Sequence, residues 1–187
     1  MKIALFGGSF NPIHNGHLQI ANELLTKQIV DQVWLIPCGN HAFDKKLASG
    51  EARMKMINLA IQNKNSIKSI GVELNPDKKS YTSKTISWFK REFPHDFYFV
   101  IGADNMKDLE KWHDFEYLKN NVKFILIKRP GFAFSNDLEI DIKHILSMNN
   151  KISSNQIREN LEKGISINGF VPKKVEKYIE LEGLYHG

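Results

Sequence analysis

The sequence predicts an α/β fold, a doubly wound parallel sheet with helices on both faces. Short apolar runs typical of buried strands alternate along the 187 residues with stretches in which apolar residues recur every three or four positions. A recurrence of apolar residues every three or four positions is typical of an amphipathic helix. Strands that alternate with helices favour a parallel sheet, and right-handed crossovers between the strands place helices on both of its faces.

The first strand–turn–helix unit spans residues 3–29. A buried strand is expected at residues 3–6, IALF, and a helix from about His17 to Ile29. The turn between them carries Gly7 and Gly8 and lies at the carboxyl end of the strand, where α/β sheets bind ligands. Glycine lets the backbone approach a phosphate closely, and a helix N-terminus offers unpaired N–H groups. A phosphate-binding turn is therefore expected here.

The remaining elements follow in order along the chain. Strands are expected at residues 32–37, 66–74, 96–101 and 122–127, loops at 39–46 and 132–139, and residues 140–148 are ambiguous. Helices are expected at residues 51–62, 83–93 and 155–163, in a stretch after Asp104, and from Pro172 onward. Residues 1–187 are expected to form a single domain, with a small helical part from about residue 151.

The composition narrows the class of protein. A net charge of +5 suggests anionic partners, and the positive residues are spread along the chain, which favours small phosphorylated substrates over nucleic acid. The only cysteine, Cys38, has no partner for a disulfide within the chain, which fits a reducing compartment. There is no secretory signal and no apolar run of about 18 residues, so a cytoplasmic protein without a membrane span is expected.

Two histidines, His14 and His17, lie in the first turn. A tight turn that leads into a helix can aim both at one point, and imidazoles there can donate hydrogen bonds to phosphate oxygens. The alternative is two solvent-facing histidines or a metal site, but no carboxylate or cysteine is spaced to complete a metal site. Lys45 and Lys46 lie in the next loop at the same sheet edge, where they either reach a phosphate or are solvated.

The stretch ISSNQIR, residues 152–158, is the second informative segment. Ser153, Ser154 and Asn155 all favour a helix N-cap, and Arg158 shares a helix face with Ser154. A hydroxyl, free N–H groups and a guanidinium can converge on one anion. A plain capped surface helix is the alternative.

Both segments resemble known motifs. GGSFNPIHNGH resembles the GxFxPxHxGH signature of the nucleotidylyltransferase superfamily, and ISSNQIR resembles the ISSTxIR motif of its adenylyltransferases, with Asn155 in place of threonine. The cytidylyltransferase form of the second motif is absent, which favours ATP over CTP. The resemblance implies a Rossmann-like nucleotidylyltransferase fold. The signature residues present are Gly8, Phe10, Pro12, His14, Gly16 and His17.

Segments in the middle of the chain resemble bacterial nicotinate-mononucleotide adenylyltransferases. The resemblance implies that Tyr81 and Thr82 lie along the nicotinate end, that Asp104 contacts a ribose, and that Trp112, followed by His113, stacks on the pyridine ring. The Pro-His-Lys segment of that family is altered, so that Lys45 or Lys46 corresponds to its lysine. Arg53 is expected in the first turn of a helix, where the helix dipole disfavours a cation. A cation in such a position hints at a use, so Arg53 is added to the residues expected to bind the acceptor.

The resemblance implies transfer of AMP from ATP to nicotinate mononucleotide in NAD biosynthesis. Mg²⁺ is expected as the cofactor, held mainly by ATP phosphates without a protein metal site. The expected partners are ATP and a pyridine mononucleotide, and neither a membrane nor nucleic acid is expected. A homo-oligomer is compatible with the sequence. Nicotinamide mononucleotide or phosphopantetheine are alternative acceptors, and a non-catalytic nucleotide- or RNA-binding module is the alternative of another class. The expected catalytic residues are His14, His17, Lys45, Lys46 and Arg158, and those expected to bind ATP are Gly7, Gly8, Ser9, Phe10, His14, Gly16, His17, Ser153, Ser154 and Arg158.

Overall fold

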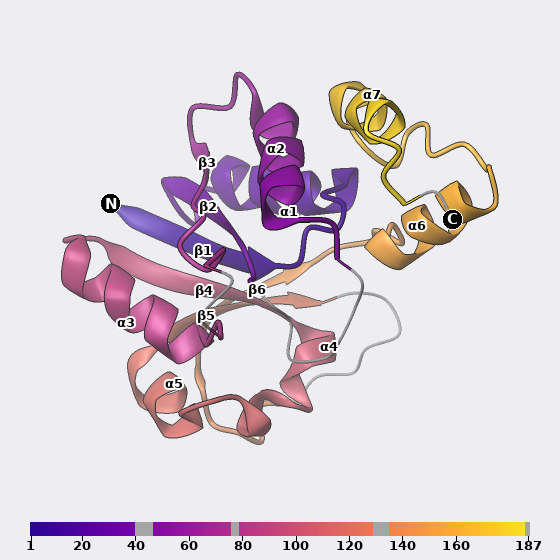
Figure 1. Ribbon diagram of the computed structural model, residues 1–187. Coiled ribbons are helices and arrows are strands. Elements are labelled where there is room, and N and C mark those ends of the chain that lie inside the picture. The colour runs from indigo at the N-terminus through magenta and orange to yellow at the C-terminus, as the bar shows by residue number, and fades with distance from the viewer. Residues whose placement is uncertain (40–46, 76–78, 129–134, 186–187) are drawn as a thin grey trace.

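The computed structural model describes residues 1–39, 47–75, 79–128 and 135–185. Within them, six parallel strands form one sheet in the order β3-β2-β1-β4-β5-β6, shown in Figure 1. The chain runs outward from β1 to β3, then returns to the other side of β1, so the topology reverses between β1 and β4. The predicted doubly wound parallel sheet is confirmed. The strands are β1 (Lys2–Gly8), β2 (Gln32–Pro37), β3 (Ile67–Ser69), β4 (Asp96–Gly102), β5 (Lys123–Lys128) and β6 (Asp141–Ser147).

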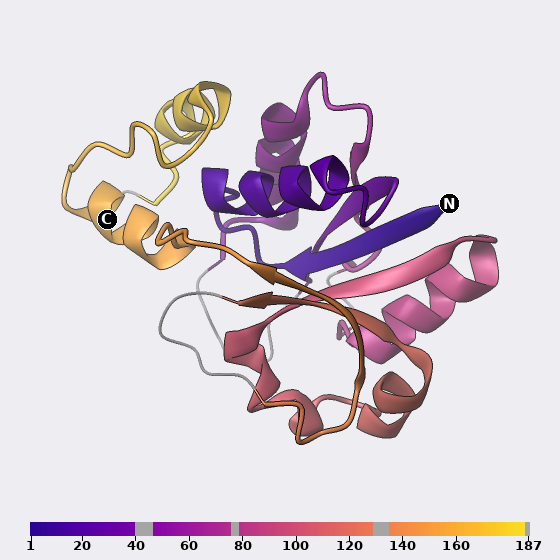
Figure 2. The ribbon, with the colours of Figure 1, turned by 180° about the vertical axis from the view of Figure 1, so that it is seen from behind.

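Helices cover both faces of the sheet (Figures 1 and 2). The helices α1 and α2 lie on one face, and α3 and α5 lie on the other. No helix in the described part of the chain is long and apolar enough to cross a membrane. The helices are α1 (Asn15–Thr26), α2 (Gly50–Ile61), α3 (Thr82–Glu92), α4 (Ala103–Met106), the 3₁₀-helix η1 (Leu109–Lys111), α5 (Phe115–Asn121), α6 (Ser154–Glu162) and α7 (Lys173–Leu181).

Consecutive apolar residues of the central strand β1 pack into two different cores. Ala4 and Phe6 belong to the core cluster beneath α1 and α2, whereas Ile3 and Leu5 belong to the cluster beneath α3 and α5. Successive side chains of a strand point to opposite faces, so a strand covered on both sides needs a continuous apolar run. The same division of neighbouring residues between two cores repeats along β2.

The third strand is shorter than predicted. It ends at Ser69, whereas a strand to residue 74 was expected. Beyond Ile70, whose N–H donates to the carbonyl of Leu35, the chain turns at Gly71, and the N–H of Leu74 donates to the Gly71 carbonyl. The neighbouring strand β2 ends at Pro37, which has no N–H to extend the ladder. The ambiguous residues 140–148 form the edge strand β6.

The C-terminal helices share the core of the sheet. Ile157 of α6 and both Val175 and Ile179 of α7 are fully buried in the cluster that contains β1 residues. This packing places α6 and α7 at the same end of the molecule (Figures 1 and 2), and α6 contacts the first strand–helix turn through Ser154 and Pro12.

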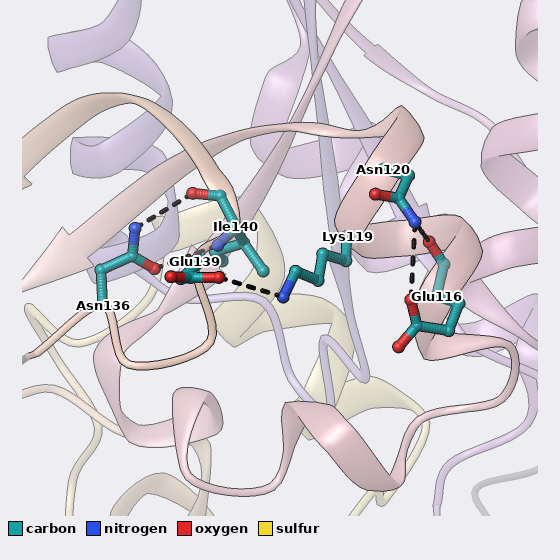
Figure 3. A network of polar contacts seen from close by, with 6 residues as sticks. All are labelled: Glu116, Lys119, Asn120, Asn136, Glu139 and Ile140. Carbon is teal, nitrogen blue, oxygen red and sulfur yellow. Dashed lines mark hydrogen bonds and ion pairs between the residues drawn. The ribbon is translucent and has the colours of Figure 1, made fainter.

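Figure 3 shows contacts on the approach to β6, together with those of Asn120 with Glu116 inside α5. The Asn136 amide donates to the carbonyl of Ile140 at 3.1 Å and accepts from its N–H at 3.3 Å. Lys119 of α5 lies 3.5 Å from the carboxylate of Glu139, an exposed pair of the kind that contributes little to stability. Buried Ile140, clamped by Asn136, is therefore the main anchor of this connection.

Candidate active site

The loop of residues 9–14 connects β1 to α1 at the carboxyl end of β1, beside the point where the topology reverses. Its side chains are mostly buried: Phe10, Asn11 and Ile13 are at most 1% exposed. Phe10 has a φ of 45°, an unfavourable value for a residue other than glycine. Packing of the Phe10 ring offsets that cost, because its centroid lies 5.8 Å from the Phe6 ring and 5.0 Å from the His17 ring. Phe10 and Ile13 of this loop thus belong to the hydrophobic core.

His14 and His17 lie together at the start of α1. Their rings stack with centroids 3.7 Å apart and planes 25° apart. The backbone N–H of His14 donates to Nδ1 of His17 at 3.3 Å. A neutral imidazole that accepts at Nδ1 carries its proton on Nε2, so His17 presents an N–H donor there. The structure therefore brings the two predicted histidines to one place.

Gly16 makes the stacked arrangement possible. A Cβ at this position would lie 3.0 Å from two atoms of the His14 ring, tighter than ordinary contact. Glycine is favoured here by the close approach of the His14 ring, which a Cβ would displace by a few tenths of an ångström, and not by a positive φ. Steric contact with the His14 ring therefore explains why a glycine lies between the two histidines.

The N-terminus of α6 packs against the same loop. Ser153 is the N-cap and accepts from the N–H of Gln156 at 3.2 Å. The Ser154 hydroxyl donates to the carbonyl of Pro12 at 2.9 Å, and Arg158 Nη1 donates to the carbonyl of Asn11 at 2.7 Å. The structure places Ser154 and Arg158 against the first turn, and their expected convergence on an anion stays a prediction. Its serine and arginine contact the loop backbone, which adds a tethering role to the expected phosphate contact.

Asn155, the departure from threonine in the second motif, has a specific contact. Its Oδ1 accepts from Arg158 Nη2 at 2.5 Å. The guanidinium is thus held by Asn155 on one side and by the Asn11 carbonyl on the other. The asparagine helps to orient the arginine.

Arg53 does not occupy the place expected of an acceptor ligand. It is 3% exposed and lies beneath the loops, where Nη1 donates to the carbonyls of Ser9 and Cys38 at 2.9 and 2.8 Å and Nε donates to that of Ala48 at 3.0 Å. A guanidinium bonded to three backbone carbonyls is a clamp between segments. The helix-dipole reasoning from the sequence missed this, because two of the three carbonyls that hold Arg53 come from residues 15 and 44 positions away.

The residues predicted to bind the acceptor lie beyond the carboxyl end of β4. Gly102 ends β4 at the sheet edge where Gly8 ends β1, and Asp104 follows in α4. The rings of Tyr81 and His113 stack with centroids 4.1 Å apart, and Nδ1 of His113 lies 3.2 Å from the Ser83 hydroxyl. The rings of Trp112 and Phe99 lie edge to face with their centroids 6.2 Å apart. Thr82 is the first residue of α3. The structure thus brings Tyr81 and His113 into direct contact, and Trp112 precedes His113 in the chain and packs on Phe99.

Glu73 contacts Gly39, Ser80 and Thr85, a set of contacts that sequence reasoning missed. A Cβ at Gly39 would lie 2.2 Å from the Glu73 carbonyl, so only glycine fits there. The Thr85 hydroxyl donates to the Glu73 carboxylate at 2.7 Å. Burial raises the pKa of Glu73, and its hydrogen bonds oppose that shift.

Burial likewise raises the pKa of the Cys38 thiol, while Arg53 lowers it, so the thiol stays neutral near pH 7.

Lys45 and Lys46 lie outside the described residues. Among the residues that are described, no group of three or more histidine, cysteine, aspartate or glutamate side chains is arranged to hold a metal ion.

Comparison with known proteins identifies the family. A family model described as cytidylyltransferase-like matches residues 5–160. The nicotinate-nucleotide adenylyltransferase of Bacillus subtilis is 37% identical over 187 residues, which cover 98% of both chains. The chain belongs to the nicotinate-nucleotide adenylyltransferases of this family. It is a nucleotidyltransferase, and the resemblance inferred from the motifs is confirmed.

Other relatives agree. A probable nicotinate-nucleotide adenylyltransferase of Clostridium tetani is 34% identical, and the match covers 98% of each chain. A structure of the Plasmodium falciparum nicotinic acid mononucleotide adenylyltransferase complexed with NaAD superposes with a TM-score of 0.84 at 24% identity, covering 98% of this chain and 97% of that one. At that identity the likeness shows the fold.

The stacked histidines lead to a first prediction. Gly16→Ala should separate the His14 and His17 rings while leaving α1 folded, because alanine favours a helix by about 1 kcal/mol over glycine. The ring-proton shifts of both histidines in NMR spectra should then move away from their stacked values. Asn22→Ala, an exposed change on the same helix, is the control and should leave them unaltered. Unmoved ring signals in the Gly16 variant would contradict the steric role.

The buried clamp leads to a second prediction. Arg53→Leu should lower the free energy of unfolding by about 3–5 kcal/mol, because several buried carbonyls lose a charged donor. Urea denaturation measures this. Lys55→Ala, an exposed change on α2, should alter it by less than about 0.5 kcal/mol. A fully stable Arg53 variant with weakened mononucleotide binding would return this residue to the acceptor site.

Proposed function

We propose that the protein transfers the AMP group of ATP to nicotinate mononucleotide, forming nicotinate adenine dinucleotide and pyrophosphate in NAD biosynthesis. The observation that carries the proposal is the His14–His17 pair, stacked at the N-terminus of α1 and faced by the N-terminus of α6. Two helix N-termini and two imidazoles form an anion site suited to a polyphosphate. The names of the relatives in Bacillus subtilis and Clostridium tetani support the same activity.

The reaction needs positioning more than proton transfer. An oxygen of the mononucleotide phosphate attacks the α-phosphorus of ATP, a new P–O bond forms, and the bond to the bridging oxygen breaks as pyrophosphate leaves with the electron pair. The attacking oxygen is already anionic, so no general base is required. The protein stabilises charge that develops on the α-phosphoryl and leaving oxygens. The Nε2–H of His17 and the imidazole of His14 are the proposed donors.

The triphosphate would lie over the loop of residues 9–14. We assign its binding to the backbone of residues 7–10, to Gly16, to the N-terminus of α6 at Ser153 and Ser154, and to Arg158. The Arg158 guanidinium carries five N–H groups, and its recorded bonds to Asn11 and Asn155 hold it in place while its charge acts on the phosphates. Lys45 or Lys46 would complete the neutralisation of pyrophosphate.

Mg²⁺ would enter with ATP. The side chains gathered at this site are imidazoles and a guanidinium, which are partners for phosphate, whereas Mg²⁺ prefers carboxylate and phosphate oxygens. The ion would therefore be held by phosphate oxygens and water, where it neutralises charge on the leaving group. This leaves the protein to orient the α-phosphate.

The acceptor would lie beyond β4. We assign its ribose to Asp104 and its flat ring to the aromatic group of Tyr81, Trp112 and His113, since aromatic faces suit a heteroaromatic ring. The helix α3 begins at Thr82, and the Tyr81 side chain does not cap it. A helix N-terminus favours a carboxylate, which supports nicotinate over nicotinamide. Arg53 is left out of this set because it clamps the loops from beneath.

The choice of acceptor is tested by product analysis. With ATP and Mg²⁺, nicotinate mononucleotide should give a dinucleotide and pyrophosphate at least about tenfold faster than nicotinamide mononucleotide, a ratio that corresponds to about 1.4 kcal/mol. Phosphopantetheine should give no dephospho-CoA. Equal rates with both mononucleotides would remove the acid preference, and no product with any acceptor would contradict the proposed activity and favour a binding module.

The role of the histidine is tested by His17→Ala. Loss of an electrostatic donor should lower kcat by about 10²–10³ while ATP binding and the circular dichroism spectrum stay close to those of the wild type. The control is His144→Ala on the edge strand β6, whose turnover should match the wild type. Near-normal turnover of the His17 variant would remove its catalytic assignment.

A further inference from the structure

The side chain of Asn11 joins three segments that are distant in sequence. Its Oδ1 accepts from the N–H of Ala48 at 3.0 Å and from the hydroxyl of Tyr185 at 2.7 Å. Its backbone carbonyl accepts from Arg158 at 2.7 Å. Asn11 therefore ties the histidine loop to the segment before α2, to α6 and to the C-terminal end of the chain.

Tyr185 is placed by a rigid turn. The helix α7 ends in a Schellman motif, in which the N–H of Leu184 donates to the Ile179 carbonyl and the N–H of Gly183 donates to the Glu180 carbonyl. Gly183 has the φ of 57° that this motif needs. Leu184 and Tyr185 then pack on the core cluster that contains Ile179. The position of the Tyr185 hydroxyl is thus set by packed structure.

The two donors on Oδ1 fix the orientation of the Asn11 amide. Turning the amide over would place its NH₂ group against an N–H and an O–H, and both hydrogen bonds would be lost. The amide is 1% exposed, so water cannot replace those bonds without an opening of the loop. Burial raises the pKa of Tyr185, which keeps its hydroxyl a donor throughout the usual assay range.

Asn11 is close enough to His14 in the chain for its contacts to affect the position of the histidines. Asn11 lies three residues before His14, and the loop between them has no regular hydrogen-bond ladder of its own. Its shape depends on contacts from outside: Tyr185 and Arg158 on Asn11, and Ser154 on the carbonyl of Pro12. A small displacement of reacting groups is costly, since about 1 Å of misplacement can cost about 10² in rate.

We infer that Tyr185 is a positioning residue for adenylyl transfer, acting through Asn11 on the loop that carries His14 and His17. The inference rests on the proposed function. It adds the last turn of the chain to the active site as a support for the histidines. Because the loop is displaced and not removed, the effect falls on the transition state more than on substrate binding.

The test is Tyr185→Phe, which removes only the hydroxyl. The value of kcat should fall about tenfold while KM for ATP stays within about twofold, the signature of lost positioning. Tyr178→Phe is the matched control, because Tyr178 packs on the same cluster and makes no recorded side-chain hydrogen bond to a described residue. It should retain wild-type kcat. An equal fall in both variants would assign the effect to general C-terminal stability and overturn the inference.

A double-mutant cycle tests the route through Asn11. In an Asn11→Ala background, Tyr185→Phe should cause no further loss, because the acceptor of its hydrogen bond is already gone. In an Asn11→Asp background, which keeps two acceptor oxygens, Tyr185→Phe should still lower kcat. Equal, additive losses in the alanine background would show that Tyr185 acts elsewhere and would overturn the inference.

Hydrogen exchange separates this inference from the proposed function. Amides of residues 9–18 should exchange faster in Tyr185→Phe than in the wild type or in Tyr178→Phe, whatever reaction the protein performs. Absence of dinucleotide from the wild-type protein would refute the function alone. Unchanged kcat in an active Tyr185→Phe protein would refute the positioning role, with or without faster exchange.

Discussion

The loop between β1 and α1 is held by donors that come from other parts of the chain, and the active site depends on this. Its carbonyl groups face a guanidinium from α2, a guanidinium from α6 and a serine hydroxyl from the start of α6. Backbone carbonyls in a buried loop must find donors, and charged donors form the stronger bonds. The strained backbone at Phe10 is sustained by the same surroundings.

This arrangement also sets the electrostatics of the site. Arg53 and Arg158 bring positive charge close to the phosphate-binding turn while their hydrogen bonds to carbonyls fix where that charge lies. A charge that is already oriented needs no reorganisation when negative charge develops in the reaction. Arg53 is buried, so in the proposed reaction it would act through its charge, whereas the half-buried Arg158 on α6 is proposed both to hold the loop and to contact phosphate.

The two halves of the site sit on either side of the topological reversal. The proposed nucleotide half is built on the end of β1 and on α6, and the proposed acceptor half is built beyond the end of β4 and on α3. Gly39, pressed against the Glu73 carbonyl, lets the loops beneath them meet without a side chain between. In the proposed arrangement the parallel sheet would bring both substrates to one edge, as is usual for α/β sheets.

The sequence by itself determined the sheet, the first turn and the family. Continuous apolar runs and helical spacing carry the fold locally, and the motif around His14 and His17 lies within one short segment, so no long-range contact was needed to find it. It also indicated that α6 would serve the same site. Only the tertiary structure decided the place of Arg53, the contact of Asn155, the length of β3 and the contact of Tyr185 with Asn11. The contacts of Arg53 with Ser9 and of Tyr185 with Asn11 join residues 44 and 174 positions apart, and periodicity and local propensity carry no information about such pairs. Asn155 and Arg158 are only three residues apart, and there the side-chain geometry decided the contact.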